Sequence, residues 1–253
     1  MPVDRELWKQ PILANRAPGY NCPRCRTGAL LLVKDSLKDA TSADAARDRQ
    51  REGWDPTEDV GRFVALLRCN ARNCSESVTV VGVRYTEPNF DPEDGTGWEF
   101  QYYPQYFDPP LNHFAIPEKC PESVRTEICN SFRLALLDPS GAAARLRTAI
   151  ERLLDAQGVR ARARKPGKIV RVSLHERIEI FRQNKPELAD ALMAVKWLGN
   201  AGTHDTALQR DDLFDAYDIV EHVVDELISE RTARVRSLAK QINKRRGPRT
   251  RRQ

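Results

Sequence analysis

The chain has 253 residues, of which 40% are hydrophobic, 30% charged and 7% aromatic, a composition that predicts one or two domains and a largely helical main domain. No stretch approaches the ~20 apolar residues of a membrane span, and the N-terminus lacks the apolar core of a signal peptide, which argues against a membrane protein and predicts a cytoplasmic one. The formal net charge of +5 is uneven, because residues 231–253 hold ten of the 41 basic residues and no acidic one, which leaves 31 basic against 36 acidic residues in the remainder.

Two pairs of cysteines lie early in the chain, each in a polar turn beside a predicted strand. A reducing compartment disfavours a disulfide framework, whereas four thiolates form the closed tetrahedral site that structural zinc prefers. The alternative is a set of four unligated thiols. We predict a small β-rich, zinc-ribbon-like domain over residues 1–110, with a structural Zn²⁺ bound by Cys22, Cys25, Cys69 and Cys74.

The cysteine spacing departs from an ordinary zinc ribbon in two respects. The second turn is Cys-x4-Cys where Cys-x2-Cys is commoner, and 43 residues separate Cys25 from Cys69 where ribbons usually have ~15–20. Residues 34–60 are polar and charged and account for the excess, so we expect an insertion at the ribbon tip that is a loop or a short helix. Cys120 and Cys129 are expected to be inert thiols.

Residues 86–121 combine prolines with interleaved aromatic residues. The alternation in residues 97–107 predicts a strand or hairpin edge that breaks at Pro104. Interleaved rings can stack on nucleic-acid bases, or they can pack the ribbon onto the next domain. The scarcity of basic residues in this segment favours packing.

From Glu118 onward the apolar residues recur with a helical period. These segments predict an α+β chain in which residues 111–230 form an all-α bundle. Arg147 lies one turn before Glu151 and is expected to pair with it on the surface. The helical period begins at Glu118, and cap residues and proline at the first helical position predict further helix starts after Ser140 and at Ser173, Pro186 and Asp211 or Asp212.

Two basic segments accompany the helices. Residues 160–171 hold six basic residues around a Pro-Gly turn, and residues 231–253 continue as a weak amphipathic helix and then a tail that is disordered when free. Both segments can contact nucleic acid. The alternatives are a solvated connector and a tail that binds an acidic partner. The predicted nucleic-acid-binding residues are Arg160, Arg162, Arg164, Lys165, Lys244, Arg245, Arg246 and Arg249.

Residues 188–205 continue an apolar helical stripe with polar side chains. Lys196, Asn200 and His204 lie four residues apart, so they share one face if the helix continues through Gly199. A cation, an amide and an imidazole on one face can bind a phosphate or move a proton near neutral pH. The alternative is structural, with Asn200 and His204 capping the helix and fastening it to a neighbour.

The segments AAARLRTAIERLLDAQG and VKWLGNAGTHD, followed by a capped amphipathic helix, resemble the HEPN-like helical domain family (domain of unknown function 4145). The resemblance covers residues 118–230. It implies a bundle that dimerises with the motifs of two protomers close together, in a family that also occurs behind zinc ribbons and in type I restriction subunits. A homodimer through the bundle and a role in bacterial defence or nucleic-acid metabolism are therefore expected.

HEPN ribonucleases, which this family is similar to, carry an Arg-Asn-x-x-x-His motif. The resemblance implies metal-independent RNA cleavage, in which the histidine handles protons at the 2′-hydroxyl and the arginine steadies the phosphate charge. Asn200 and His204 match this motif, but Gly199 stands in place of the arginine. One turn earlier, where the family tends to have arginine, Lys196 lacks the bidentate fork of a guanidinium. Losing such a cation typically costs ~3–4 kcal/mol of transition-state stabilisation unless Lys196 or Arg147 substitutes.

Three functions are compatible with these features. The first is a nucleic-acid-associated protein, non-catalytic or weakly catalytic, and the missing arginine, the closed thiolate site and the basic tail favour it. The second is a metal-independent endoribonuclease, a toxin or antiviral effector, with His204 as acid and base, Asn200 orienting it and Lys196 holding the phosphate. The third is a protein-interaction adaptor whose tail binds an acidic protein.

Overall fold

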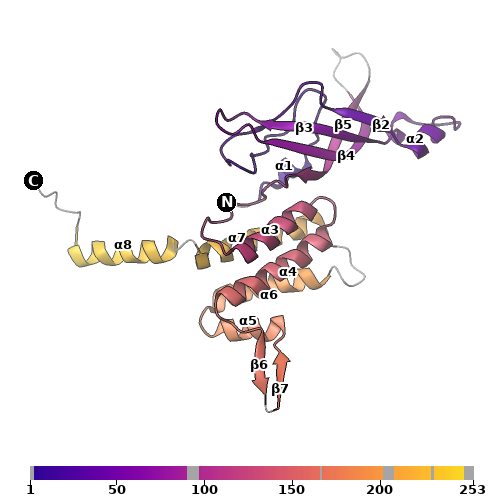
Figure 1. The fold of residues 1–253 in the computed structure, drawn as a ribbon. Helices are drawn as coiled ribbons and strands as arrows, with labels where there is room; N and C mark the ends of the chain where they lie inside the picture. Colours follow the sequence, from indigo (N-terminus) through magenta and orange to yellow (C-terminus); the bar gives the residue numbers. More distant parts are fainter. Residues whose placement is uncertain (1–2, 90–96, 166, 202–207, 229–230, 248–253) are drawn as a thin grey trace, which may run out of the picture.

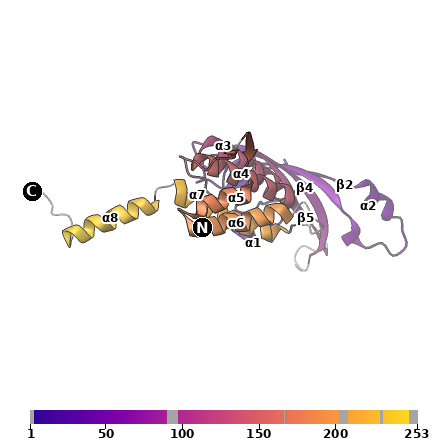
Figure 2. The same ribbon diagram turned by 90° about the horizontal axis from the view of Figure 1, so that it is seen from below.

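The computed structural model describes residues 3–89, 97–165, 167–201, 208–228 and 231–247. An N-terminal antiparallel sheet lies on one side of a set of helices, so the chain has the mixed α and β class that its sequence predicts (Figure 1). Seen from below, helix α8 (Arg231–Arg245) extends away from the rest, on the side opposite helix α2 (Ala43–Asp48) (Figure 2). None of the described helices is both long and apolar enough to cross a bilayer.

A five-stranded antiparallel sheet forms the N-terminal half. Strand β4 pairs with β3 on one side and β5 on the other, while β1 and β2 share the remaining side of β3. Phe63, Ala65 and Leu67 of β3 face the core and the residues between them face outward, which is the alternation expected of a half-buried strand. The strands span Leu30–Leu32 (β1), Lys38–Thr41 (β2), Gly61–Cys69 (β3), Ser77–Pro88 (β4) and Trp98–Asp108 (β5).

The insertion at residues 34–60 is part of this sheet, and the expectation of a loop or short helix is therefore incomplete. Besides α2 and a short 3-10 helix (Pro56–Glu58), it contains β2, which pairs with β3. No apolar alternation marks β2, since its side chains are exposed or half-buried. Its pairing with residues 61–64 fixes it in the sheet.

A buried ion pair anchors the insertion to the neighbouring strands. The guanidinium of Arg84 on β4 is almost fully buried and donates to Asp59 at 2.8 Å. The hydroxyl of Tyr102 on β5 donates to Asp39 at 2.6 Å. Removing one member of such a pair leaves an uncompensated buried charge, so these contacts hold the insertion in place.

Strand β5 continues through Pro104, contrary to the expected break. The register against β4 shifts between Val81 and Gly82, which leaves one residue of β5 without a partner. A β-bulge of this kind tolerates proline, which has no N–H to donate. Gly82 is needed here because a Cβ would overlap the carbonyl oxygen of Tyr103.

Helices α3 to α7 form the C-terminal half. Asp138 caps α4 by accepting from the Gly141 N–H at 2.8 Å, and Ser173 and Glu176 form a capping box at α5. Their apolar faces pack together, with α4 and α6 in contact at the centre. The helices span Glu122–Leu134 (α3), Pro139–Ala156 (α4), Leu174–Arg182 (α5), Pro186–Ala201 (α6) and Arg210–Ile228 (α7).

The bundle is not all-α, which corrects the expectation for residues 111–230. Strands β6 (Arg162–Lys165) and β7 (Lys168–Arg171) form an antiparallel hairpin that projects from its end (Figure 1). Buried Arg177 donates to Asp155 and to the carbonyl of Val159, both at 2.7 Å, and so ties the root of the hairpin to α4. The alternation of arginine and alanine in this segment is a strand period of two.

The two halves share one hydrophobic core. Helix α1 (Arg5–Lys9) places Trp8 against the ring of His113, with centroids 4.0 Å apart, and His113 stacks on Tyr217 of α7 at 5.0 Å. Phe114 packs edge-on against Phe132 of α3 at 5.0 Å. Packing therefore continues across residue 110, and the buried side chains of sheet and bundle form one cluster.

Candidate metal centre and helical motif

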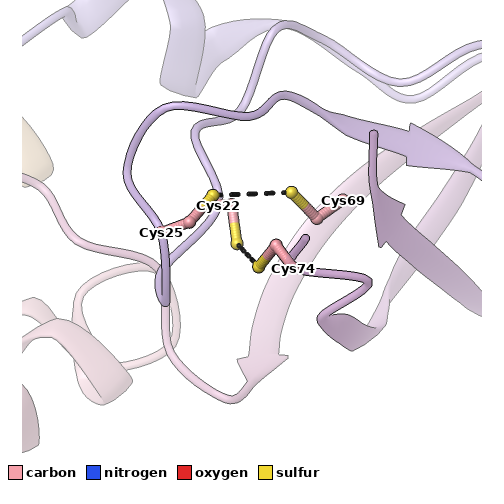
Figure 3. A group of neighbouring side chains, drawn as sticks. All are labelled: Cys22, Cys25, Cys69 and Cys74. Atoms are coloured by element: carbon pink, nitrogen blue, oxygen red, sulfur yellow. Dashed lines mark hydrogen bonds between the residues drawn. The ribbon is translucent and has the colours of Figure 1, made fainter. Parts of the chain in front are cut away.

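The structure brings together the four cysteines that the sequence predicts as ligands. All four sulfur atoms lie within 4.8 Å of one another, with Cys22–Cys74 and Cys25–Cys69 separated by 3.6 Å (Figure 3). Sulfurs bound ~2.3 Å from a tetrahedral zinc are ~3.8 Å apart, so the cluster has the size of a metal site. In the described part of the chain no other group of potential metal ligands gathers so closely.

The backbone around each cysteine pair directs amide groups at sulfur. The Gly28 N–H donates to Cys25 Sγ at 3.3 Å and the Ala71 N–H donates to Cys69 Sγ at 3.4 Å. Such bonds favour the thiolate over the thiol. The first turn closes through a left-handed residue, Arg26, with φ of 61°.

The four cysteines can all be thiolates only with a cation between them. Backbone N–H donors, that of Thr27 first, lower the pKa of Cys25 to about 6, whereas burial raises the pKa of Cys22. The Ala71 N–H opposes the shift at Cys69, but burial and the neighbouring cysteine sulfurs raise the pKa of Cys69 to about 12. Four thiolates at these distances repel one another unless a positive ion lies between them. A soft set of four sulfurs with tetrahedral spacing fits zinc, and a closed set of four protein ligands suits a structural role.

The helical motif lies at the contact of α6 with α4. Helix α6 continues through Gly199, which lies so close to α4 that a Cβ there would be 3.0 Å from the Ala143 carbonyl oxygen. Beside it, Arg147 of α4 donates from Nη1 to Oδ1 of Asn200. The expected surface pair of Arg147 with Glu151 is not what the structure has: Arg147 contacts Asn200, and Glu151 pairs with Arg171 at 3.8 Å.

Lys196 lies on the same helix, one turn before Asn200, but it is buried. Only 7% of Lys196 is exposed, and its Nζ lies 3.5 Å from the ring centroid of Trp197. The ammonium group therefore has a cation–π contact, while Arg147 of α4 contacts the motif amide. His204 lies outside the described residues.

The sequence identified Arg147 only as a neighbour of Glu151 within one helix. Its contact with Asn200 joins residues 53 positions apart, and no local spacing predicts such a pair. The small residue at Gly199 is the one sequence signal, because a glycine inside a helical pattern often marks a close helix contact.

The predicted nucleic-acid-binding residues fall on two separate elements. Figure 1 shows the β6–β7 hairpin at one end of the bundle and α8 leaving from another side. Arg160, Arg162 and Arg164 are exposed at the hairpin, and Lys165 belongs to β6. Lys244, Arg245 and Arg246 are exposed at the end of α8. Arg249 lies outside the described residues.

Two domain families match the chain. Residues 130–245 match a domain of unknown function (DUF4145), and residues 10–111 match another domain of unknown function (DUF8608). The first match agrees with the family that the helical segments resemble and extends through α8, and the second covers the sheet with all four clustered cysteines. No curated protein and no solved structure matches the chain.

Proposed function

We propose that this protein is a nucleic-acid-associated protein with a structural zinc site, non-catalytic or weakly catalytic, that acts in bacterial defence or nucleic-acid metabolism. The observation that carries the proposal is the arrangement of basic residues. Residues 231–253 hold ten basic residues and no acidic one, and the side chains at the end of α8 are exposed. Lysine and arginine on a projecting helix can reach phosphates without steric hindrance from the core.

Removal of residues 231–253 tests this proposal. Each phosphate contact contributes about 0.9 to the slope of log affinity against log salt for duplex DNA, and about 0.7 for single strands. We expect the truncated protein to bind RNA or DNA more weakly and with a shallower slope. A matched variant neutralises Lys240, Lys244, Arg245 and Arg246 to glutamine and keeps the helix length. If both variants bind nucleic acid as the parent does, with the same slope, the proposal is wrong and salt-sensitive binding to an acidic protein becomes the better account.

The zinc site of this proposal has its own test. Metal analysis of the purified protein should give one zinc ion per chain, and Co²⁺ substitution should give the visible absorption of a tetrahedral tetrathiolate site. Cys25→Ser should reduce metal content, whereas Cys129→Ser, at a half-buried cysteine of α3 outside the cluster, should leave it unchanged. Equal zinc content in both variants would argue for unligated thiols.

The contact between Arg147 and Asn200 favours a second candidate function, a metal-independent endoribonuclease. An arginine at position 199 would collide with α4, since even a Cβ there would lie 3.1 Å from Arg147 Cβ. Arg147 instead brings a guanidinium from the neighbouring helix to the motif asparagine. In this reading Arg147 stabilises phosphate charge and His204 transfers protons, the roles that the resemblance assigns to its arginine and histidine.

RNA cleavage in the presence of a chelator tests the nuclease function. We expect His204→Ala to abolish cleavage, and Arg147→Ala to reduce it 100-fold or more, because removing one transition-state donor costs ~10²–10³ in rate. Arg147→Lys should retain part of the activity, since a point charge replaces the guanidinium fork. Equal cleavage by the parent and His204→Ala identifies a contaminating nuclease and ends this alternative.

A further inference from the structure

The outward face of the N-terminal sheet carries exposed apolar side chains. In Figure 1 the bundle helices lie below the sheet, and the buried residues of β3 lie on the opposite side of that strand from Val64. Val64 of β3 and Val81 of β4 are paired in register and are 43% and 38% exposed. We call this surface the outer face and define it by Leu31, Val64, Val81, Tyr85, Tyr103 and Tyr106, which share one side of the sheet by register and alternation.

Charged residues on the outer face are separated by sign. Three basic residues stand on β2 and β3, and three acidic residues stand on β4 and β5. None of the six forms an ion pair within the part of the chain that the structure describes. Their sum is zero, which does not suit a polyanion such as nucleic acid. The six residues are Lys38, Arg62, Arg68, Glu87, Glu99 and Asp108.

We propose that the outer face binds the outer face of a second copy of this chain. In a two-fold symmetric interface the same patch meets itself, so separated charges are favourable only if rotation brings unlike signs together. A two-fold axis parallel to the strands lays β4 over β4 and β3 over β5. Arg68 then approaches the partner's Asp108, and Arg62 faces the ring of the partner's Tyr103, an attractive arrangement for each cation.

The dimensions of the outer face suit a dimer of modest affinity. Four strand positions at ~4.8 Å and about nine residues at ~3.4 Å give a surface of ~600 Å², against ~800 Å² per partner in a standard interface. Packed sheets interdigitate side chains across ~10 Å, which the valines and tyrosines supply. This interface differs from a dimer through the helical bundle, and it does not depend on nucleic-acid binding.

Sedimentation of the full chain, freed of nucleic acid and kept in its zinc-bound form, tests the proposal between about 1 and 100 µM. We expect a concentration-dependent monomer–dimer equilibrium. Val64→Glu and Val81→Glu should each weaken it at least 100-fold, because a carboxylate would be buried in the interface. Ile180→Glu on α5 is the matched control, since Ile180 is 47% exposed but lies on the bundle. A strictly monomeric parent, or a dimer dissociated by Ile180→Glu and not by the valine variants, would overturn the proposal.

Charge reversal provides a second test that does not depend on the valines. Arg68→Glu and Asp108→Arg should each weaken the dimer about tenfold, and the double variant should restore most of the loss, because the swapped pair is again complementary. Both positions are exposed, so the variants should fold. Additive weakening in the double variant would show that these residues do not meet across a dimer and would contradict the proposed geometry.

Discussion

His113 is enclosed by aromatic rings at the junction of the two halves. Trp8 and Tyr217 stack near its ring, and its Nδ1 has no hydrogen-bond partner among the described residues. Burial, together with the positive charge of Arg210, lowers the pKa of His113 to about 3. The folded protein therefore holds this imidazole neutral at a pH where the unfolded chain protonates it.

This burial predicts a loss of stability in mild acid. The unfolded pKa is ~6.5, so below that pH, and down to about 3, the unfolded chain binds one proton more than the folded chain. Above pH 6.5 His113 is neutral in both states and its burial costs no stability through protonation. Below that pH the free energy of unfolding falls by about 1.4 kcal/mol for each pH unit. Between pH 7 and 5, urea unfolding of the parent should show about 2 kcal/mol more loss than His113→Phe. Equal losses would contradict a neutral buried imidazole, and the cysteines, present in both proteins, do not affect the difference.

Gly28 is required where the two cysteine turns approach each other. A Cβ at Gly28 would overlap Cys69 Sγ and lie 2.9 Å from Ala71 Cβ, and neither atom is the end of a flexible side chain. We expect Gly28→Ala to weaken zinc retention against a chelator at least tenfold and to lower the melting temperature. Gly19→Ala is the control, because nothing lies within 4 Å of a Cβ at that position and its φ is ordinary. Similar behaviour of the two variants would show that the turns can separate.

At the scale of elements, the basic hairpin offers a test of nucleic-acid contact that leaves α8 intact. Arg162 and Arg164 alternate with alanines on β6, and both are exposed. Replacing both with glutamine should reduce the slope of log affinity against log salt for duplex DNA by up to about 2, if each contacts a phosphate. Ile169→Gln, at a 70% exposed position of β7, keeps every charge and should leave the slope unchanged. An unchanged slope in the arginine variant would assign phosphate binding to α8 alone.

Elements with a strong local period follow from the sequence, and those fixed by distant partners do not. The helices of the bundle were predictable because apolar residues recur every three to four positions, and β3 because they alternate. The two cysteine pairs resemble those of a zinc ribbon closely enough in residue type and spacing that their cluster was predictable. Strand β2 was not predictable, because the strand that it pairs with, β3, lies some twenty residues further on, and its own residues are mostly polar. The contact of Arg147 with Asn200 likewise depends on helix packing that no short window records.

Across the whole molecule, the cysteine cluster and the bundle are linked through one core. Cys22 and Cys69 belong to the same buried cluster as Phe132 of α3 and Tyr217 of α7. Helix α1 also contacts α7 directly, because Arg5 donates to Asp215 at 2.5 Å. Because the buried side chains form one cluster, we expect the two halves to unfold in a single transition. Loss of the proposed zinc ion should therefore destabilise helices that do not touch the cysteine cluster.

Removal of zinc tests this linkage. With excess chelator we expect the helical circular dichroism signal and the near-ultraviolet tryptophan signal to melt together, both at a temperature at least 10 °C below that of the zinc-bound protein. A stabilisation of about 3–4 kcal/mol by the ion would suffice, at 2–4 °C for each kcal/mol in a chain of this size. Cys22→Ser should reproduce the chelator effect, whereas Cys129→Ser, outside the cluster, should retain the response to chelator. Helices that melt at one temperature with and without zinc would show that the sheet unfolds independently, and that the shared core does not couple the two halves.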